Sequence, residues 1–143
     1  MELKYKNIES SLCTDIMWKI TEEQKNLLSF EHVEAVLLFR IDGLLFSSEI
    51  NDIKQFNLLD SIKWIKSIIT KVGEELSTSD LYRIAYSRKE EHIYFYRVGS
   101  AAILACVLNR WANVGLLSIE MDRIAYKISN IIASENLALL YID

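Results

Sequence analysis

Apolar residues near the start of the chain recur at helical spacing. Between residues 6 and 29 they are separated by three, four and seven positions, which is typical of a helix that buries one face. Within this stretch, Thr21 and Gln24 have the spacing of a capping box, in which each side chain binds the other residue's free backbone amide. The helix therefore either begins again at Thr21 or runs straight through. Its apolar face consists of Cys13, Met17, Ile20, Leu27 and Leu28.

A second helix is predicted for residues 53–76, where apolar residues follow a seven-residue repeat. Trp64 and Ile68 lie one turn apart beside this repeat, so the helix has more apolar surface than a single contact requires. Two interpretations are open: the helix has one wide core face, or it packs on a sheet and also on a partner helix. The repeat consists of Leu58, Ile62, Ile65, Ile69, Val72 and Leu76.

A β-hairpin is predicted between these two helices. Residues 33–41 are rich in β-branched and aliphatic side chains, which favours a strand. Asp42 and Gly43 follow, and this pair marks a tight turn because glycine accepts the positive φ that the turn requires. Residues 44–48 then form the expected return strand.

Three more strands are predicted after the second helix. Residues 81–87 and 92–98 both alternate between the two faces of a sheet, and residues 88–91 between them are expected to form a solvated, charged turn. Residues 101–108 are apolar at almost every position, which is typical of a central strand that is covered on both sides. The first of these strands is expected to place on one face the side chains of Tyr82, Ile84 and Tyr86.

A final helix is predicted to begin near Asn113, because asparagine commonly caps helix N-termini, and to run to about Ala133. After it, residues 137–142 form an apolar tail. The sequence leaves open whether this tail extends the helix, adds a strand or covers a groove. The apolar face of the helix consists of Leu117, Met121, Ile124, Ile128 and Ile131.

The predicted order of elements is helix, two strands, helix, three strands, helix. A single five-stranded antiparallel sheet with helices on its faces accounts for this α-β-β-α-β-β-β-α order, an α/β fold of the α+β kind. The chain of 143 residues has no proline and only four glycines, so we expect one domain over residues 1–143 without a linker. Residues 1–14 are expected to be a helical extension of that domain, and residues 134–143 an apolar tail.

Charge and composition narrow the classes of function. The formal net charge of −4 provides no basic field for phosphates, so no nucleic-acid partner is expected. No apolar run approaches the roughly 20 residues that span a bilayer, and the N-terminal segment lacks the apolar core of a secretory signal. Cys13 and Cys106 lie among apolar neighbours without a CxxC partner, so we expect buried, reduced thiols in a cytoplasmic protein.

The sequence contains no catalytic motif that we recognise. It has no GxxxxGK[ST] loop, so the chain is not itself a P-loop GTPase, and it has no GxSxG elbow. His32 and His92 have no clustered cysteine or aspartate partner, which argues against zinc. We therefore expect no enzymatic activity, no cofactor and no metal, although one arginine would suffice as an arginine finger. The tyrosines of neighbouring strands are interpreted as core or interface residues rather than as a base-stacking platform.

Two segments resemble the roadblock (dynein light chain) family, which has this order of elements. The first hairpin of the family is similar to residues 33–49, VEAVLLFRIDGLLFSSE. Its last strand and helix are similar to residues 96–128, YRVGSAAILACVLNRWANVGLLSIEMDRIAYKI, where an N-x-G-L sequence from Asn113 opens the helix. The resemblance covers about residues 15–133. It is broken around Trp111, because many relatives have a smaller, acidic turn there.

The resemblance implies a dimer of the chain with itself or with another roadblock protein. In this family the third strand lies at an edge of the sheet, where two protomers pair strands and lay their second helices together. A third strand without proline and with little charge agrees with such a role. The residues expected at the interface are Trp64, Ile68, Leu81, Tyr82, Ile84 and Tyr86.

The resemblance also implies a partner. Family members bind small Ras-like GTPases or scaffold complexes that contain them, and the paired second helices commonly form part of that contact. The chain is thus expected to be a non-enzymatic scaffold or regulator that biases the nucleotide state or the location of such a GTPase. The candidate contact residues, on the exposed side of the second helix, are Lys63, Lys66, Ser67, Thr70 and Lys71.

Two other interpretations are open. One is a sensory module of PAS, GAF or profilin-like architecture that encloses a small ligand, although the last strand offers almost no polar group to line such a cavity. The other is a purely structural subunit that pairs with a different roadblock protein.

Overall fold

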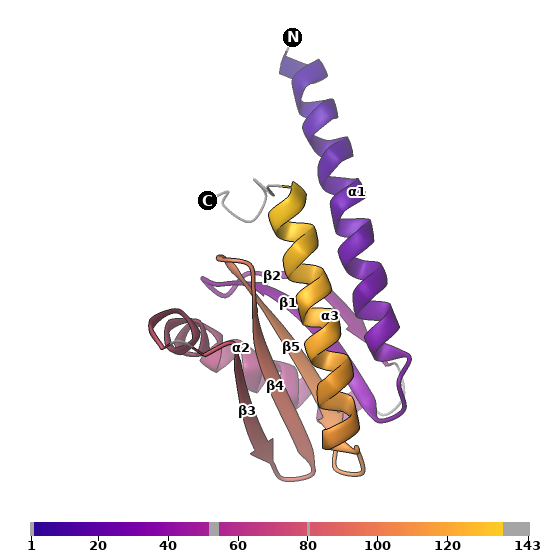
Figure 1. Ribbon diagram of the computed structural model, residues 1–143, viewed down its shortest axis with the longest axis vertical. Coiled ribbons are helices and arrows are strands. Elements are labelled where there is room, and N and C mark those ends of the chain that lie inside the picture. Colours follow the sequence, from indigo (N-terminus) through magenta and orange to yellow (C-terminus); the bar gives the residue numbers. More distant parts are fainter. Residues whose placement is uncertain (1, 52–54, 80, 136–143) are drawn as a thin grey trace.

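Five antiparallel strands form one sheet, and three helices pack on its two faces (Figure 1). The computed structural model describes residues 2–51, 55–79 and 81–135, and it describes side chains for residues 15–51, 58–79 and 81–134. The order of elements is the one that the sequence predicted. The elements are α1 (Glu2–Leu28), β1 (Val33–Arg40), β2 (Leu45–Ile50), α2 (Gln55–Thr78), β3 (Arg83–Arg88), β4 (Glu91–Val98), β5 (Ala102–Asn109) and α3 (Val114–Glu135).

The strands lie in the order β2-β1-β5-β4-β3, with every neighbouring pair antiparallel. The apolar strand β5 is central, and residues 102–108 are all buried because both faces of the sheet are covered there. The predicted position of the third strand at an edge is confirmed: β3 pairs with β4, and β2 forms the other edge.

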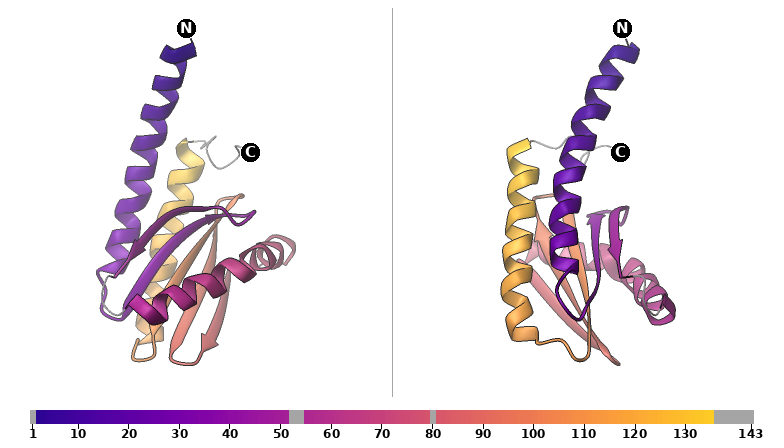
Figure 2. Two further views of the ribbon diagram at one scale, coloured as in Figure 1. Left: turned by 180° about the vertical axis from the view of Figure 1, so that it is seen from behind. Right: turned by 90° about the vertical axis from the view of Figure 1, so that its right-hand side faces the viewer.

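The two faces of the sheet are covered differently. α1 and α3 lie side by side on one face, whereas α2 alone crosses the other (Figures 1 and 2). Alternate residues of each strand point to opposite faces, so the sheet contributes to two separate cores. The core under α1 and α3 includes Ile20, Ile124 and Ile128, and the core under α2 includes Ile65 and Ile69.

The first helix runs straight through Thr21, and the predicted capping box is not formed. Gln24 is fully buried, and its Nε2 donates to the carbonyl oxygens of Val36 at 3.0 Å and Ser47 at 3.4 Å. The side chain therefore serves strands β1 and β2 instead of its own helix. A helix without a break at Thr21 has no free amide there to cap. The spacing of Thr21 and Gln24 therefore does not mark a helix start in this chain.

The first hairpin and the start of the last helix confirm two local predictions. Gly43 has a φ of 104°, and Asp42 accepts hydrogen bonds from the Arg40 guanidinium, which holds the pKa of the Asp42 carboxyl below its usual range. Asn113 caps α3, because its Oδ1 accepts the Leu116 amide at 3.2 Å. The predicted apolar tail at 137–142 lies outside the described residues.

Cys106 is a buried free thiol in the core under α1 and α3, and its burial raises the pKa of the thiol. The side chain of Cys13 lies outside the described residues. Within the described part of the chain, no helix has the length and apolar character required to cross a membrane.

Candidate functional site

A strip of apolar surface remains at the β3 edge of the face that α2 covers. Helix α2 lies close to the sheet at Gly73, where a Cβ would meet Ile41 Cγ1 at 2.9 Å and the Ile41 carbonyl oxygen at 3.3 Å. The heptad residues of α2 face this core, as predicted, and Ile62 alone among them is only partly buried. Four large side chains are left partly buried beside it, and we call them the edge strip: Trp64, Ile68, Ile84 and Tyr86.

Trp64 of the edge strip contacts an aromatic ring of β3, which in turn contacts one of β4. Its ring meets Tyr86 edge-on, with the ring centroids 5.3 Å apart, and Tyr86 in turn meets Phe95 at 5.8 Å. The Arg88 guanidinium lies 4.4 Å from the centroid of the Trp64 ring, within the range of a cation–π contact. Part of the apolar surplus of α2 is therefore used inside the chain.

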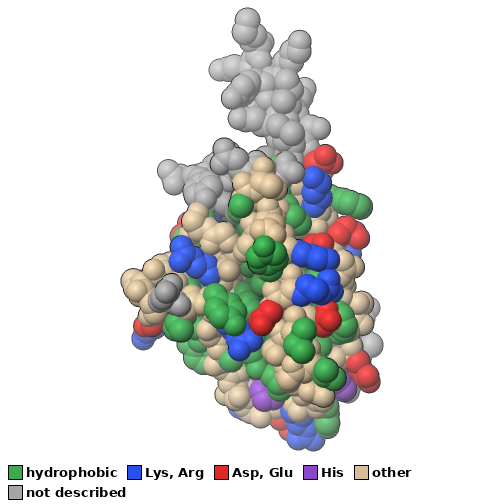
Figure 3. All heavy atoms as spheres, viewed as in Figure 1, with side chains coloured by type: hydrophobic (Ala, Val, Ile, Leu, Met, Phe, Trp, Pro, Cys, Tyr) green, Lys and Arg blue, Asp and Glu red, His purple; other side chains and the backbone are tan. Residues whose placement is uncertain are grey.

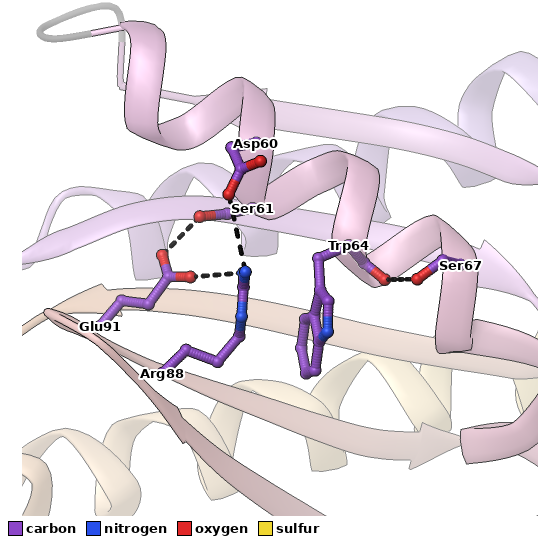
Figure 4. Close-up of polar contacts among 6 residues, drawn as sticks. All are labelled: Asp60, Ser61, Trp64, Ser67, Arg88 and Glu91. Carbon is purple, nitrogen blue, oxygen red and sulfur yellow. Dashed lines mark hydrogen bonds and ion pairs between the residues drawn. The ribbon is translucent and has the colours of Figure 1, made fainter.

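A polar network fixes the same end of α2 to the β3–β4 turn (Figure 4). Arg88 forms ion pairs with Glu91 at 2.9 Å and with Asp60 at 3.6 Å, and the Ser61 hydroxyl donates to the other oxygen of Glu91. The turn was expected to lie in solvent, and for Arg88 and Glu91 this was wrong, because both are partly buried against α2. The contact joins residues 30 positions apart, which local spacing does not reveal.

The predicted interface residues are only partly brought together. Ile84 and Tyr86 face α2, as expected, but the Tyr82 ring lies 6.4 Å from the ring of Tyr96, which belongs to the core on the opposite face. The prediction that Tyr82 shares a face with Ile84 and Tyr86 was wrong, because β3 begins at Arg83, after a turn closed by the Leu81 amide and the Ser79 carbonyl. Strand alternation does not extend back to Tyr82.

Leu81 and Tyr82 remain at the β3 edge, where 49% of Leu81 and 60% of Tyr82 is exposed. No second strand pairs with the outer edge of β3 among the residues that the structure describes. That edge therefore presents backbone groups beside both faces of the sheet, with the edge strip on one side and Tyr82 on the other.

The proposed contact residues on α2 all lie in solvent. Lys63, Lys66 and Lys71 make the middle of the helix positive, between Asp60 before it and Glu74 after it. Thr70 is exposed, with its methyl carbon close to the first hairpin at Gly43. The hydroxyl of Ser67 donates to the Trp64 carbonyl at 2.6 Å, so this side chain is already bound within the helix (Figure 4).

The opposite face has a different character. Figure 3 shows that hydrophobic side chains there are interspersed with charged ones. Arg83 of β3 pairs with Asp122 of α3 at 3.2 Å, and the Tyr96 hydroxyl donates to the same carboxylate at 2.6 Å. Burial and this hydrogen bond raise the pKa of the Tyr96 phenol. In the described part of the chain, no three His, Cys, Asp or Glu side chains are grouped as metal ligands.

A family model for the AF0774-like protein matches residues 17–122 of the sequence. The chain belongs to the AF0774-like family. The match spans the chain from α1 to the middle of α3, so it includes the whole sheet, the edge strip and the exposed lysines of α2. No curated protein matches the sequence.

Solved structures show the same fold. The gliding protein MglB from Thermus thermophilus superposes with a TM-score of 0.63 at 15% identity, over 80% of this chain and 89% of that one. MglC from Myxococcus xanthus superposes with a TM-score of 0.62 at 15% identity, over 76% of this chain and 95% of that one. A Roadblock/LC7 domain from Streptomyces avermitilis superposes with a TM-score of 0.57 at 16% identity, over 78% of this chain and 95% of that one. The chain therefore has a roadblock-type fold, which confirms the resemblance of its motifs.

Proposed function

We propose that the chain is a non-enzymatic, cytoplasmic scaffold or regulator that dimerises through β3 and α2 and binds a small Ras-like GTPase. The observation that carries this proposal is that the outer edge of β3, which is unpaired among the described residues, lies beside partly buried apolar side chains of the adjacent helix. The GTPase is the partner that the roadblock resemblance implies.

Dimerisation would complete the β3 edge in two ways. A second β3 would provide hydrogen-bond partners for the outer backbone groups, which otherwise invite unspecific pairing. A second α2 would cover Trp64 and Ile68 at the same time. Apolar burial contributes about 25 cal/mol per Å², so covering both side chains adds to the backbone pairing.

The GTPase contact would use the exposed side of α2. Lys63, Lys66 and Lys71 suit an acidic patch on the partner, with Ser67 and Thr70 between them as smaller neighbours. A regulator must bind one nucleotide state of the GTPase more tightly than the other, since equal affinity shifts no equilibrium. Nucleotide dependence is therefore the decisive property to measure.

The mass of the chain in solution at micromolar concentration tests the dimer. We expect twice the mass of one chain for the wild type, and the mass of one chain after Ile68→Lys. The matched control is Ile50→Lys at the opposite edge of the sheet, which should leave the dimer intact. A wild-type mass equal to one chain would contradict the homodimer. If a mass of two chains appeared only after a different roadblock chain was added, the protein would form a heterodimer.

Affinity capture from native lysate tests the partner. The tagged chain is incubated with GDP or with a GTP analogue, and we expect a Ras-like GTPase to be enriched with only one of them. Lys63→Glu combined with Lys66→Glu should weaken binding of that GTPase roughly tenfold, because two attractive charges become repulsive. Lys127→Glu on α3 is the control. If the GTPase is captured equally with GDP and with the GTP analogue, the chain is a structural scaffold and the regulatory role is wrong.

A further inference from the structure

The outer edge of β3 presents its backbone groups in a defined pattern. In an antiparallel pair of strands, every second residue exchanges hydrogen bonds with its neighbour, and the residues between direct their N–H and C=O groups to the other side. The Arg97 amide donates to the Tyr82 carbonyl at 3.0 Å, and the β3–β4 register continues from this pair without a shift. The residues whose backbone groups point outward are therefore Arg83, Ala85 and Ser87.

Such an edge can pair with a second copy of itself. A two-fold axis perpendicular to the sheet makes the two β3 strands antiparallel, and each contact then occurs twice. Hydrogen bonds form only where an outward residue of one copy lies opposite an outward residue of the other. Three alignments near the middle of β3 meet this condition, and they differ in the residue that lies on the axis: Ile84, Ala85 or Tyr86.

An axis at Ala85 lets all three outward residues form hydrogen bonds. Ala85 then lies opposite Ala85 of the second copy, and Arg83 lies opposite Ser87 of the second copy. Ala85 is exposed and small, so no bulky side chain crowds the axis. On the face toward α2, Ile84 lies opposite Tyr86 of the second copy, and a β-branched residue beside an aromatic ring is a favourable cross-strand pair.

An axis at Ile84 leaves part of the edge without hydrogen bonds. Ser87 then lies opposite Leu81 of the second copy, which precedes the strand. The Leu81 amide already donates to the Ser79 carbonyl at 2.6 Å, so it is not available to a second strand. Only Arg83 and Ala85 find full partners in this alignment.

An axis at Tyr86 has a different defect. Arg83 then lies opposite Lys89 of the second copy. Lys89 belongs to the β3–β4 turn and has a φ of 37°, so its backbone does not continue the strand. Its ammonium group would also bring a second cation opposite Arg83, and like charges in that position destabilise a sheet. This alignment loses hydrogen bonds and adds repulsion.

We propose that the partner at the β3 edge is a second copy of this chain, aligned with Ala85 on the two-fold axis. This inference rests on the proposed dimer through β3 and α2 and specifies it further, since a self-complementary edge needs no different roadblock chain. The alignment also keeps the ion pair of Arg83 with Asp122, because an uncharged serine of the second copy faces the arginine.

Disulfide cross-linking distinguishes the three alignments. Single cysteines are introduced at positions 84, 85 and 86 of a chain that carries Cys13→Ser, and the buried Cys106 is retained. Directly opposed residues have Cα atoms about 4.5–5.5 Å apart, within the range of a disulfide, whereas residues offset by two positions are about 7–8 Å apart. Ala85→Cys should therefore give roughly tenfold more covalent dimer than Ile84→Cys or Tyr86→Cys.

A mixture of variants and a control complete the cross-linking test. Mixing Ile84→Cys chains with Tyr86→Cys chains should restore the covalent dimer, because these residues lie opposite each other in the proposed alignment. Ser48→Cys, which is exposed on the edge strand β2, should give no covalent dimer.

The outcomes separate the alignment from the dimer itself. A protein with the mass of two chains that cross-links best at position 84 or 86 alone would overturn the alignment and keep the dimer. A dimer that cross-links at none of the three positions would show that the copies meet elsewhere. A wild-type mass equal to one chain would reject the dimer and this inference with it.

Amide hydrogen exchange on the wild-type chain avoids any effect of the substitutions on folding. At a concentration where the mass is that of two chains, the amides of Arg83, Ala85 and Ser87 should exchange at least about tenfold more slowly than after dilution to single chains. Slow exchange at only two of these amides would contradict an axis at Ala85.

Discussion

The two faces of the sheet differ in how completely they are covered. Neighbouring strands lie about 4.8 Å apart, so five strands measure roughly 19 Å across. A helix with its side chains is roughly 10–12 Å wide, so two helices cover the sheet and one does not. Under α1 and α3 the core side chains Ile20 and Ile124 are fully buried, whereas Ile68 and Tyr86 under α2 keep exposed surface.

The difference explains how a small fold leaves apolar surface accessible without a special insertion. With one helix on five strands, apolar residues at the strip beyond the helix remain accessible, and here that strip coincides with the β3 edge. Gly73 allows α2 to approach closely Ile41, which follows β1, and Ile103 of β5. The proposed partner surface is thus a consequence of layer geometry.

The largest expected effect comes from the fully covered face. Ile124→Ala should lower the free energy of unfolding by about 3 kcal/mol, since it opens a cavity among buried side chains. Ile68→Ala should cost less than about 1 kcal/mol, because part of that side chain already contacts solvent. Urea unfolding at a chain concentration low enough to keep the protein monomeric compares the two losses, because the proposed dimer would cover Ile68. Equal losses would show that the two faces are equally covered.

A smaller effect is expected where α2 approaches the sheet. Gly73→Ala should lower stability by about 1–2 kcal/mol, because the clash with Ile41 outweighs the helix propensity of alanine. Gly115→Ala in α3 is the control: its Cβ would meet only Asn113 Oδ1, at 3.5 Å, so stability should stay constant or rise. Thermal unfolding measures both. If the two variants unfold with the same change in stability, α2 is not held at the close distance described.

The smallest effect concerns the cation on Trp64. Arg88→Lys should lower stability by less than about 1 kcal/mol, because lysine cannot stack flat on the ring while pairing with Glu91. In a chain carrying Trp18→Phe and Trp111→Phe, the emission of Trp64 should shift to longer wavelength. Arg123→Lys, which alters an exposed pair with Glu120, is the control. An unchanged emission would mean that Arg88 does not shield the indole.

Local sequence patterns were sufficient for the elements and their order along the chain. The Asp42–Gly43 turn, the Asn113 cap, the apolar β5 and the heptad of α2 each act within a few residues, so each could be predicted without the others. Their order then left few possible topologies. The edge position of β3 followed from the family resemblance.

The candidate sites were harder to predict, since they depend on contacts between distant segments. The turn at residues 88–91 looked solvated because nothing in its own sequence indicates Ser61 or Trp64 as neighbours. Tyr82 was assigned to the wrong face, because alternation was extended one residue before β3 begins.

The buried amide of Gln24 has a consequence for how an edge strand keeps its alignment. Its Nε2 binds one carbonyl of β1 and one of β2, so it contacts both strands of the first hairpin from a third element. Sliding β2 by one residue would turn its side chains over and carry the Ser47 carbonyl out of reach. Strand β2 is short and contains two serines, which specify register weakly. Helix α1 thus fixes the register of the hairpin, and the alignment of one edge of the sheet depends on a residue outside the sheet.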